Sequence, residues 1–284
     1  MQTSPKVLVV YKRSSLEVAG KSLPSLSKVK DFIANHSRHK ETLYVIEHNL
    51  NELGLKYKKI SRNKKIDYSI YNIIITVGGD GTLLEAARNT GSNQLLLGVN
   101  SDPNWSIGKF CHSNADNFKK IMSRIINKTA NINKLHKLKV VIQDHKSSTK
   151  TIECLNDILV CHANPAAMGR YKIFINRQAE EHRNSGIWIS SAAGSTGAIL
   201  SAGGIRVPKE SRSIQYRPRE LYNLKGNLYK LTGGLISPGK VIKLQSMMSQ
   251  GRIFVDGAHV HYAFPYGCRA IVSSSSNYIN LVTR

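Results

Sequence analysis

Apolar residues in the first half of the chain form short runs that alternate with longer segments of helical spacing. The runs expected to form strands are residues 6–11, 55–60, 73–77 and 95–99. Two segments, 26–53 and 114–126, place apolar side chains three or four positions apart, as an amphipathic helix does. Strands that alternate with helices are typical of a parallel, doubly wound sheet. Residues 1–130 are therefore predicted to form an α/β domain of the nucleotide-binding type.

From about residue 131 the pattern changes to short β-prone runs separated by polar turns. The expected strands are residues 138–142, 151–155, 158–161, 171–175, 186–190, 241–244, 253–255, 259–262 and 270–273. Only one helix candidate, residues 197–201, interrupts them. Closely spaced strands with so little helix predict a second, all-β domain. The pattern leaves open whether this domain is a barrel or a sandwich.

The most informative stretch is NIIITVGGDGTLLEAAR, in which a β-branched run enters a glycine-rich turn and leaves as a helix. Glycines such as Gly79 and Gly81 allow backbone N–H groups to approach an anion closely. Thr82 is expected to begin the helix. Asp80 is thereby predicted to lie at the carboxyl end of a strand, where open α/β sheets bind ligands. A simple turn is the alternative, but three glycines around one acid exceed what a turn requires.

The chain carries a strong positive charge. Forty-one Lys and Arg residues against eighteen Asp and Glu leave a net charge of +23, which would concentrate nucleotides, polyphosphate or nucleic acid near the surface. A non-catalytic basic module that binds nucleotide or nucleic acid is therefore an alternative of a different class. The chain lacks the interleaved aromatic and basic residues of a single-strand binding platform. Nucleic acid is accordingly not an expected partner.

Cysteine usage and hydropathy bear on the compartment. The four cysteines show no C-x-x-C pair and are expected to be reduced thiols of a cytoplasmic protein: Cys111, Cys154, Cys161 and Cys268. The apolar run at residues 7–10 is followed at once by Lys12 and Arg13, and is too short for a signal peptide. No run of about eighteen apolar residues exists, so no membrane span is predicted.

Several motifs together resemble one enzyme family. GGDGT after a buried strand resembles the signature shared by NAD kinases, diacylglycerol-type lipid kinases and ATP-dependent 6-phosphofructokinases. Three further segments are similar to NAD kinases in particular: CLNDILVCHANPAAMGR at 154–170, SGIWISSAAGSTGAILSAGG at 185–204, and Val255-Asp256-Gly257. The wording of GVNSDP at 98–103 and AAGST at 192–196 is most similar to the plant-type NADH kinase and mitochondrial-type branch. The resemblance implies a β-sandwich-like second domain over 131–270, and a segment, 271–284, that returns to the first domain.

In the α/β domain the resemblance implies a catalytic role for Asp80. It would act as the general base that takes the proton of the adenosine 2′-hydroxyl. The backbone N–H groups around Gly79, Gly81 and Thr82 would hold phosphate oxygens.

Two residues that follow this motif are also expected to bind substrate. Asn100 belongs to GVNSDP, and Lys109 stands in Gly-Lys-Phe, where Gly-His-Leu is common in the family. Lys109 adds positive charge near the expected pyrophosphate, with a surface substitution as the alternative. One or two members of a later arginine cluster would suit the donor triphosphate: Arg206, Arg212, Arg217 and Arg219.

In the second domain the resemblance implies that Asn156 and Asp157 hold the nicotinamide half of the dinucleotide. Neighbouring amide and carboxylate groups supply both donors and acceptors, while a turn before a strand is the alternative reading. Asp256 is an expected neighbour of the site, although Asp-Gly is also a common hairpin turn.

The Gly-Ser-Thr segment is expected to contact the dinucleotide through Ser195 and Thr196, with Ser201 one turn further on; a helix N-cap is the alternative. Gly197 and the alanine after it stand where Ala-Tyr is usual, so an aromatic side chain that would stack on the ligand is lost. Ser185 replaces an aspartate that reads the adenine amino group in many relatives, and it would accept a weaker hydrogen bond.

The resulting prediction is a kinase that transfers a phosphoryl group from ATP with magnesium, or from polyphosphate, to NAD or NADH. The products would be NADP or NADPH, and the family implies a homo-oligomer, a dimer or tetramer. A lipid kinase that shares GGDGT is the alternative enzyme. His259 and His261 share one face of an expected strand, but no third ligand is in view, so no metal site of the protein's own is predicted.

Overall fold

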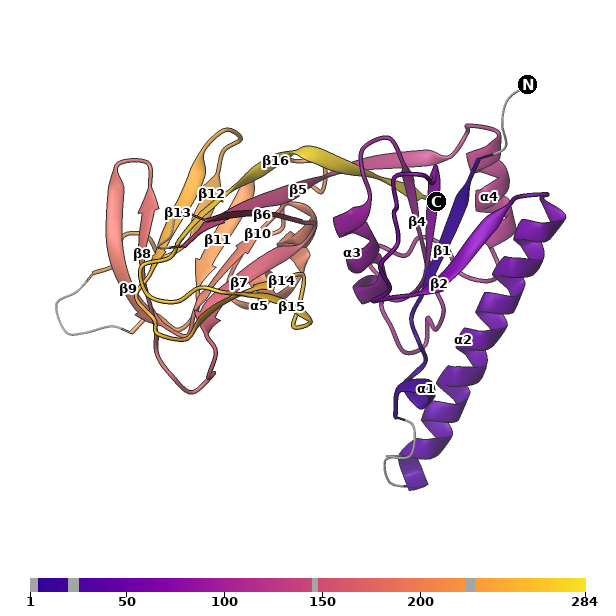
Figure 1. The fold of residues 1–284 in the computed structure, drawn as a ribbon, viewed down its shortest axis with the longest axis horizontal. Coiled ribbons are helices and arrows are strands. Elements are labelled where there is room, and N and C mark those ends of the chain that lie inside the picture. The colour runs from indigo at the N-terminus through magenta and orange to yellow at the C-terminus, as the bar shows by residue number, and fades with distance from the viewer. Residues whose placement is uncertain (1–4, 20–25, 145–147, 223–227) are drawn as a thin grey trace. The chain divides into compact units, whose positions relative to one another are not determined.

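A computed structural model describes residues 5–19, 26–144, 148–222 and 228–284 (Figure 1). The chain forms two compact units. One comprises Met1–Lys134 together with Ile279–Arg284, and the other comprises Leu135–Tyr278. The expected fold class, an α/β domain followed by an all-β domain, is confirmed.

The first unit contains a parallel sheet. Its strand order is β2 (Tyr57–Ser61), β1 (Val7–Tyr11), β3 (Ile73–Gly78) and β4 (Leu95–Asn100), with Asn280 and Leu281 of β16 (Arg269–Thr283) beside β4. The helices are α1 (Ser15–Ala19), α2 (Leu26–Glu52), α3 (Asp80–Asn89) and α4 (Phe118–Ile126). All six residues of β3 are buried, as the uninterrupted apolar run predicts for a central parallel strand.

Helices cover both faces of this sheet (Figure 1). On one face, Ile46 and Leu50 of α2 and Met122 of α4 pack against strand residues such as Ile75 in a single buried cluster. On the other face lies α3, whose Leu83 approaches β4 so closely that a Cβ on Gly98 would lie 2.6 Å from its Cδ1. Each fully buried Leu or Ile contributes about 1.5–3 kcal/mol relative to an exposed one. The helices packed on both faces therefore stabilise the sheet and hold the ends of its strands in place.

The second unit consists of two largely antiparallel sheets. One has the order β12 (Gly234–Ile236), β11 (Ile214–Pro218), β10 (Ile187–Ser190), β7 (Asp157–His162), β14 (Gly251–Val255) and β15 (Val260–Ala263). The other contains β16, β13 (Val241–Ser246), β8 (Gly169–Ile175) and β9 (Gln178–Asn184), with β5 (Asn131–Gln143) beside β16 and β6 (Thr149–Cys154) beside β5. Only short helices occur among its described residues: η1 (Ala193–Thr196) and α5 (Ala198–Ser201).

A single buried core lies between these two sheets. Ile158 and Ile189 of the first sheet belong to the same cluster as Tyr171 and Leu244 of the second. Two sheets that share one core form a sandwich, which is the alternative that the resemblance implied.

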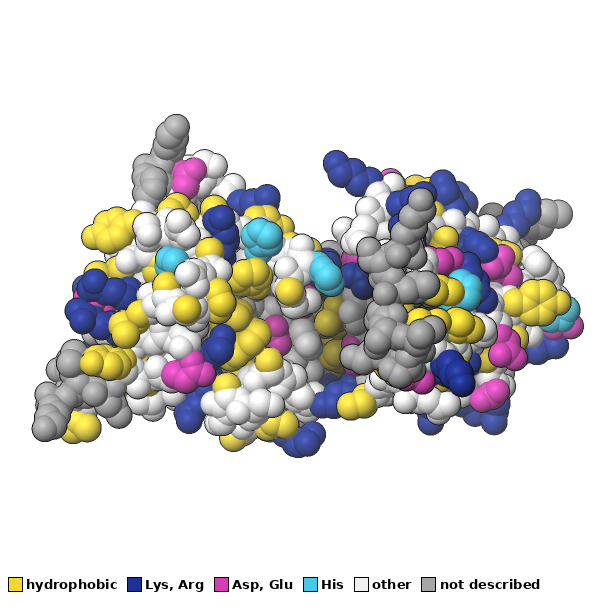
Figure 2. Space-filling view, turned by 90° about the horizontal axis from the view of Figure 1, so that it is seen from below, with side chains coloured by type: hydrophobic (Ala, Val, Ile, Leu, Met, Phe, Trp, Pro, Cys, Tyr) yellow, Lys and Arg dark blue, Asp and Glu magenta, His cyan; other side chains and the backbone are white. Residues whose placement is uncertain are grey.

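Charge and hydropathy add two observations. Lys and Arg side chains occur in scattered groups on the face shown in Figure 2, without a continuous basic field. No helix in the described part of the chain combines the length and the apolar character needed to cross a membrane.

Candidate active site

The glycine corner, defined here as residues 78–82, joins β3 to α3. The helix begins at Asp80, with Gly79 as its N-cap and no side-chain capping bond. The prediction that Thr82 begins the helix was therefore wrong: Thr82 is buried within the first turn, and a Cβ on Gly78 would lie 2.5 Å from its hydroxyl oxygen. The close approach of this side chain leaves room only for glycine at that position.

Asp80 holds a defined orientation at the corner. Its Oδ2 accepts a hydrogen bond of 2.9 Å from the Lys109 N–H, and its Oδ1 accepts one of 2.9 Å from the Phe110 N–H. Each carboxylate oxygen retains a second lone pair that can accept the proton of a substrate hydroxyl. Burial, together with the charge of this carboxylate, raises the pKa of the nearby Cys111 thiol to about 12, so this cysteine is a protonated side chain at neutral pH.

The segment that supplies these N–H groups, residues 101–113, is called the corner loop. Asn100 fixes it from within: its Nδ2 donates to the Ser106 carbonyl at 2.8 Å, and its Oδ1 accepts from the Asp102 N–H at 3.1 Å. The structure thus gives Asn100, an expected substrate-binding residue, two partners inside the protein. The side chain of Ser106 lies against Gly79, where an added Cβ would be 2.7 Å from its hydroxyl oxygen.

Asp102 ties the corner loop to α2. The buried carboxylate accepts hydrogen bonds from Asn35 Nδ2 at 2.6 Å and from the Nε and Nη2 of Arg38 at 2.9 and 3.0 Å. Burial alone would raise the pKa of Asp102, but the bonds from Arg38 and Asn35 outweigh that effect and lower it. Sequence reasoning missed this anchor, although Asp102 stands two residues after Asn100 in the GVNSDP motif.

In the second unit Asp256 joins two of the expected motifs. It lies in the left-handed region (φ +49°) just after β14. Its Oδ1 accepts a 2.8 Å hydrogen bond from the Asn156 N–H, and Oδ2 accepts a longer one from the Leu155 N–H. The Asp256 N–H in turn donates to the Asp157 carbonyl at 3.0 Å. The Asn-Asp and Val-Asp-Gly motifs are therefore held together by hydrogen bonds.

Asp157 is a buried acid whose pKa is strongly raised. The residue is 6% exposed, and burial together with the charge of Asp256 raises its pKa to about 7. A carboxyl group that titrates near neutrality can either donate or accept a hydrogen bond to a ribose hydroxyl or an amide.

The Gly-Ser-Thr segment packs directly over Asn156 and Asp157. A Cβ on Gly194 would lie 2.1 Å from the Asn156 carbonyl oxygen, so no larger residue fits without moving the backbone. A Cβ on Gly197 would lie 3.5 Å from both Asn156 Nδ2 and Asp157 Oδ2. The segment itself forms η1, and neither η1 nor α5 has a side-chain cap, so the N-cap alternative for this segment was wrong.

The hydroxyl residues of this segment differ in accessibility. Ser195 is fully buried, and its oxygen accepts from the Val207 N–H at 3.0 Å and donates to the Val207 carbonyl at 3.3 Å. Its hydroxyl therefore holds the chain at Val207, whereas the sequence had suggested a ligand contact. Thr196 is half-buried and Ser201 is exposed at the end of α5.

Ser185 lines a separate cavity of about 430 Å³ on the β10–β7–β14 sheet. Trp188, Phe254 and Arg219 are among its other lining residues. Of the arginines suggested for the donor, Arg217 forms hydrogen bonds within the protein. Its Nε donates to the Ala202 carbonyl and its Nη1 to the Thr232 carbonyl, both at 3.1 Å.

Curated relatives match most of the chain. A probable NADH kinase of Oryza sativa subsp. japonica is 29% identical over 90% of this chain and 85% of its own length. An NADH kinase of Arabidopsis thaliana is 28% identical over 94% of this chain and 90% of its own length. An NAD kinase of Aquifex aeolicus is 29% identical over 68% and 72%, respectively. No family model matches the chain.

Two solved kinase structures are similar in fold to this chain. Yeast NADH kinase complexed with NADH aligns with a TM-score of 0.77 and 17% identity, covering all of this chain and 84% of that one. An NAD kinase from Archaeoglobus fulgidus in complex with ATP aligns with a TM-score of 0.69 and 19% identity, covering 97% of this chain and 92% of that one. In sequence, the chain is similar to NADH kinases and NAD kinases over most of its length.

Proposed function

We propose that this protein transfers a phosphoryl group from ATP to the adenosine 2′-hydroxyl of NAD or NADH, which gives NADP or NADPH. The observation that carries the proposal is Asp80, a lone carboxylate oriented by two backbone N–H groups at the carboxyl end of a central parallel strand. The similarity to NADH and NAD kinases supports the choice of substrate.

In this mechanism Asp80 accepts the proton of the 2′-hydroxyl as the oxygen attacks the transferred phosphorus. The Lys109 and Phe110 N–H groups keep the carboxylate pointed at one place, which reduces the entropic cost of the reaction. The N–H groups of Gly79 and Gly81 support the same proposal as donors to phosphate oxygens. The Thr82 N–H, which the sequence had also suggested, instead donates to the Gly79 carbonyl at 3.0 Å.

Asn156 and Asp157 are proposed to bind the nicotinamide half of the dinucleotide, with Thr196 and Gly197 beside them. Their amide and carboxyl groups meet at the Gly-Ser-Thr segment, and Asp256 holds their backbone in place. We also propose Ser185, Ser201 and Lys109 as peripheral contacts, as the family resemblance suggests.

Magnesium would enter with the phosphoryl donor. Across the described residues, no three His, Cys, Asp or Glu side chains are grouped so as to hold a metal ion. The oxygens of ATP and bound water would therefore supply most of its ligands, and the ion would neutralise charge on the donor. Inorganic polyphosphate is a second proposed donor, because it offers the same phosphoanhydride.

We infer further that the protein works in the cytoplasm as a homo-oligomer, a dimer or tetramer. None of the four cysteines forms a disulfide in the structure, which supports a reducing compartment. The oligomer rests on the family resemblance, and sedimentation of the purified protein measures its size.

The test is a coupled assay that offers NAD or NADH as acceptor and ATP or polyphosphate as donor, with diacylglycerol as a control acceptor. Phosphorylation of at least one dinucleotide is expected, and lipid phosphorylation without it would reject the proposal. Asp80→Asn should lower kcat by about 10²–10⁴-fold, the usual contribution of a general base, while the circular dichroism spectrum stays unchanged. A folded Asp80→Asn enzyme with full activity would show that another group takes the proton.

A further inference from the structure

Three neighbouring parallel strands end at the glycine corner, and two of them are followed by cations. Lys12 follows β1 and Arg62 follows β2. The Lys12 N–H donates to the Val77 carbonyl of β3 at 3.1 Å, and the Arg62 N–H donates to the Tyr11 carbonyl of β1 at 2.8 Å. These bonds continue the sheet by one residue, so the backbone of Lys12 is fixed beside β3, the strand that leads into Asp80, and that of Arg62 is fixed beside β1.

Arg62 is aimed by a carboxylate of the helix that starts at the corner. Its Nε bonds Glu85 Oε2 of α3 at 3.0 Å, and the Asn63 N–H donates to the other oxygen of Glu85. The Arg62 side chain is 22% exposed and that of Glu85 is 13% exposed. Its terminal nitrogens make no hydrogen bond among the described residues, and Nη1 would lie only 3.7 Å from a Cβ on Gly81. A guanidinium held by one edge offers its other edge to an anion.

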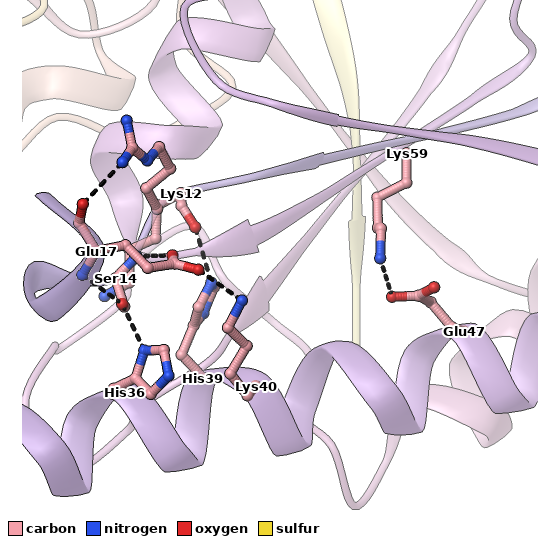
Figure 3. A network of polar contacts seen from close by, with 9 residues as sticks. Lys12, Ser14, Glu17, His36, His39, Lys40, Glu47 and Lys59 are labelled. Carbon is pink, nitrogen blue, oxygen red and sulfur yellow. Dashed lines mark hydrogen bonds and ion pairs between the residues drawn. The ribbon is translucent and has the colours of Figure 1, made fainter.

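The Lys12 side chain runs along the other side of the corner, where its Cγ would lie 3.3 Å from a Cβ on Gly78. Its ammonium forms no hydrogen bond or ion pair within the described part of the chain. Figure 3 shows how its backbone is held: the carbonyl of Lys12 accepts a 2.7 Å hydrogen bond from Nε2 of His39, a fully buried residue of α2. The backbone is fixed and the ammonium is left to bind something else.

The electrostatics agree with this geometry. Burial lowers the pKa of Lys12, the charge of Asp102 raises it, and the like charge of Arg62 lowers it further. Two cations close enough to repel each other are stabilised when an anion lies between them. Two hydroxyl groups, those of Thr82 and Ser106, also border the corner at Gly78 and Gly79, and each can donate to a phosphate oxygen.

We propose that Lys12 and Arg62 bind the polyphosphate chain of the phosphoryl donor, with Glu85 as the residue that positions Arg62. The proposal rests on the kinase function above, because a phosphorus atom transferred near Asp80 must be held at this corner. It places the donor phosphates on the first unit, whereas the sequence had suggested arginines of residues 206–219. Glu85 is a positioning residue and does not itself touch the donor.

The test compares Lys12→Met and Arg62→Gln with a matched control, Lys59→Met. Lys59 also belongs to the β2 region, but its ammonium is paired with Glu47 of α2 (Figure 3). For Lys12→Met and Arg62→Gln we expect the Kd of ATP, measured by calorimetry without acceptor, and the KM of ATP to rise about 10- to 100-fold, as for the loss of a charged hydrogen bond. The KM of NAD should stay within about twofold, and tripolyphosphate should lose affinity like ATP because the contact is to phosphate.

Two further variants separate binding from folding. Lys12→Arg keeps the charge and should retain ATP affinity, while Glu85→Gln should weaken ATP binding less than Arg62→Gln. ATP affinity unchanged in both Lys12→Met and Arg62→Gln would overturn the proposal. So would a rise in the KM of NAD with that of ATP unchanged, which would place the dinucleotide pyrophosphate here. Calorimetry also separates this proposal from the kinase function, since ATP binding is measured without turnover.

Discussion

At the scale of single residues, Asp157 should make stability depend on pH. An unfolded aspartate titrates near 3.8, whereas burial and Asp256 raise the pKa of Asp157 to about 7. Well below pH 3.8 both states are protonated and the folded state carries no penalty. As pH rises from 4 to 7 the unfolded state loses its proton first, so the free energy of unfolding falls, and above 7 the loss is complete.

Asp157→Asn removes this titration. The variant should match the parent at about pH 3 and exceed it at about pH 8 by on the order of a few kcal/mol, as measured by urea unfolding. Asp67→Asn is the control with the opposite sign, because hydrogen bonds from Ser69 lower the pKa of that exposed carboxyl. An advantage of Asp157→Asn that is the same at both pH values would show that the charge at this position does not titrate.

At the scale of elements, the contact between η1 and the turn before β7 should tolerate no side chain. In Gly194→Ala the new Cβ would meet the Asn156 carbonyl at 2.1 Å, so the backbone must shift. We expect a loss of about 1–3 kcal/mol in unfolding free energy, the usual cost of overpacking, and a raised KM for NAD. Gly234→Ala is the control, since its Cβ would meet nothing closer than 3.6 Å. Equal stability of the two variants would contradict the packing described here.

Two of the elements that sequence reasoning found, β3 and α4, have a complete apolar pattern. β3 is buried along its whole length, and the apolar spacing of α4 has a single possible face. β9 was missed because its sequence, QAEEHRN, is polar: the residues it buries are His182 and Asn184. His182 is satisfied there by Glu180 and the Tyr171 hydroxyl, a network that no periodicity reveals.

The candidate site likewise contains residues that could be selected from the sequence and residues that could not. The motif residues Asp80, Asn156 and Asp256 could be selected from sequence because glycines and turn residues surround them. The buried position of Ser195 depends on Val207, twelve residues away, and could not be foreseen. Lys12 and Arg62 gave a weaker signal in the sequence. Lys12 directly follows the expected strand 6–11 and Arg62 lies two residues after the expected strand 55–60, but many other lysines and arginines occur in the chain.

At the scale of the whole molecule, the two units should respond differently to loss of the last residues. The second unit is continuous in sequence, Leu135–Tyr278, whereas the first also needs Ile279–Arg284. Ending the chain after Tyr278 removes the pairing of Asn280 and Leu281 with β4, together with the buried Ile279 and Val282.

Calorimetry of that truncated chain should show the first unit melting at a lower temperature while the second unit is unchanged. Replacing Arg284 alone, by Ala, is the control, because it removes only an exposed side chain and its hydrogen bond to the His112 carbonyl while the strand pairing remains. A truncated chain whose two transitions both stay in place would mean that β16 adds nothing to the first sheet.

The first unit is built from two separate segments of the chain, so its parts are synthesised at different times. A ribosome makes the chain from its N-terminus, so β4 is complete long before the strand that pairs beside it leaves the exit tunnel. During that interval the outer edge of β4 around Leu95 and Leu96 has open N–H and C=O groups, which other nascent chains can pair with. The domain that is translated first is therefore the one that reaches its native state last, and a chaperone that shields that edge would raise the yield of folded enzyme.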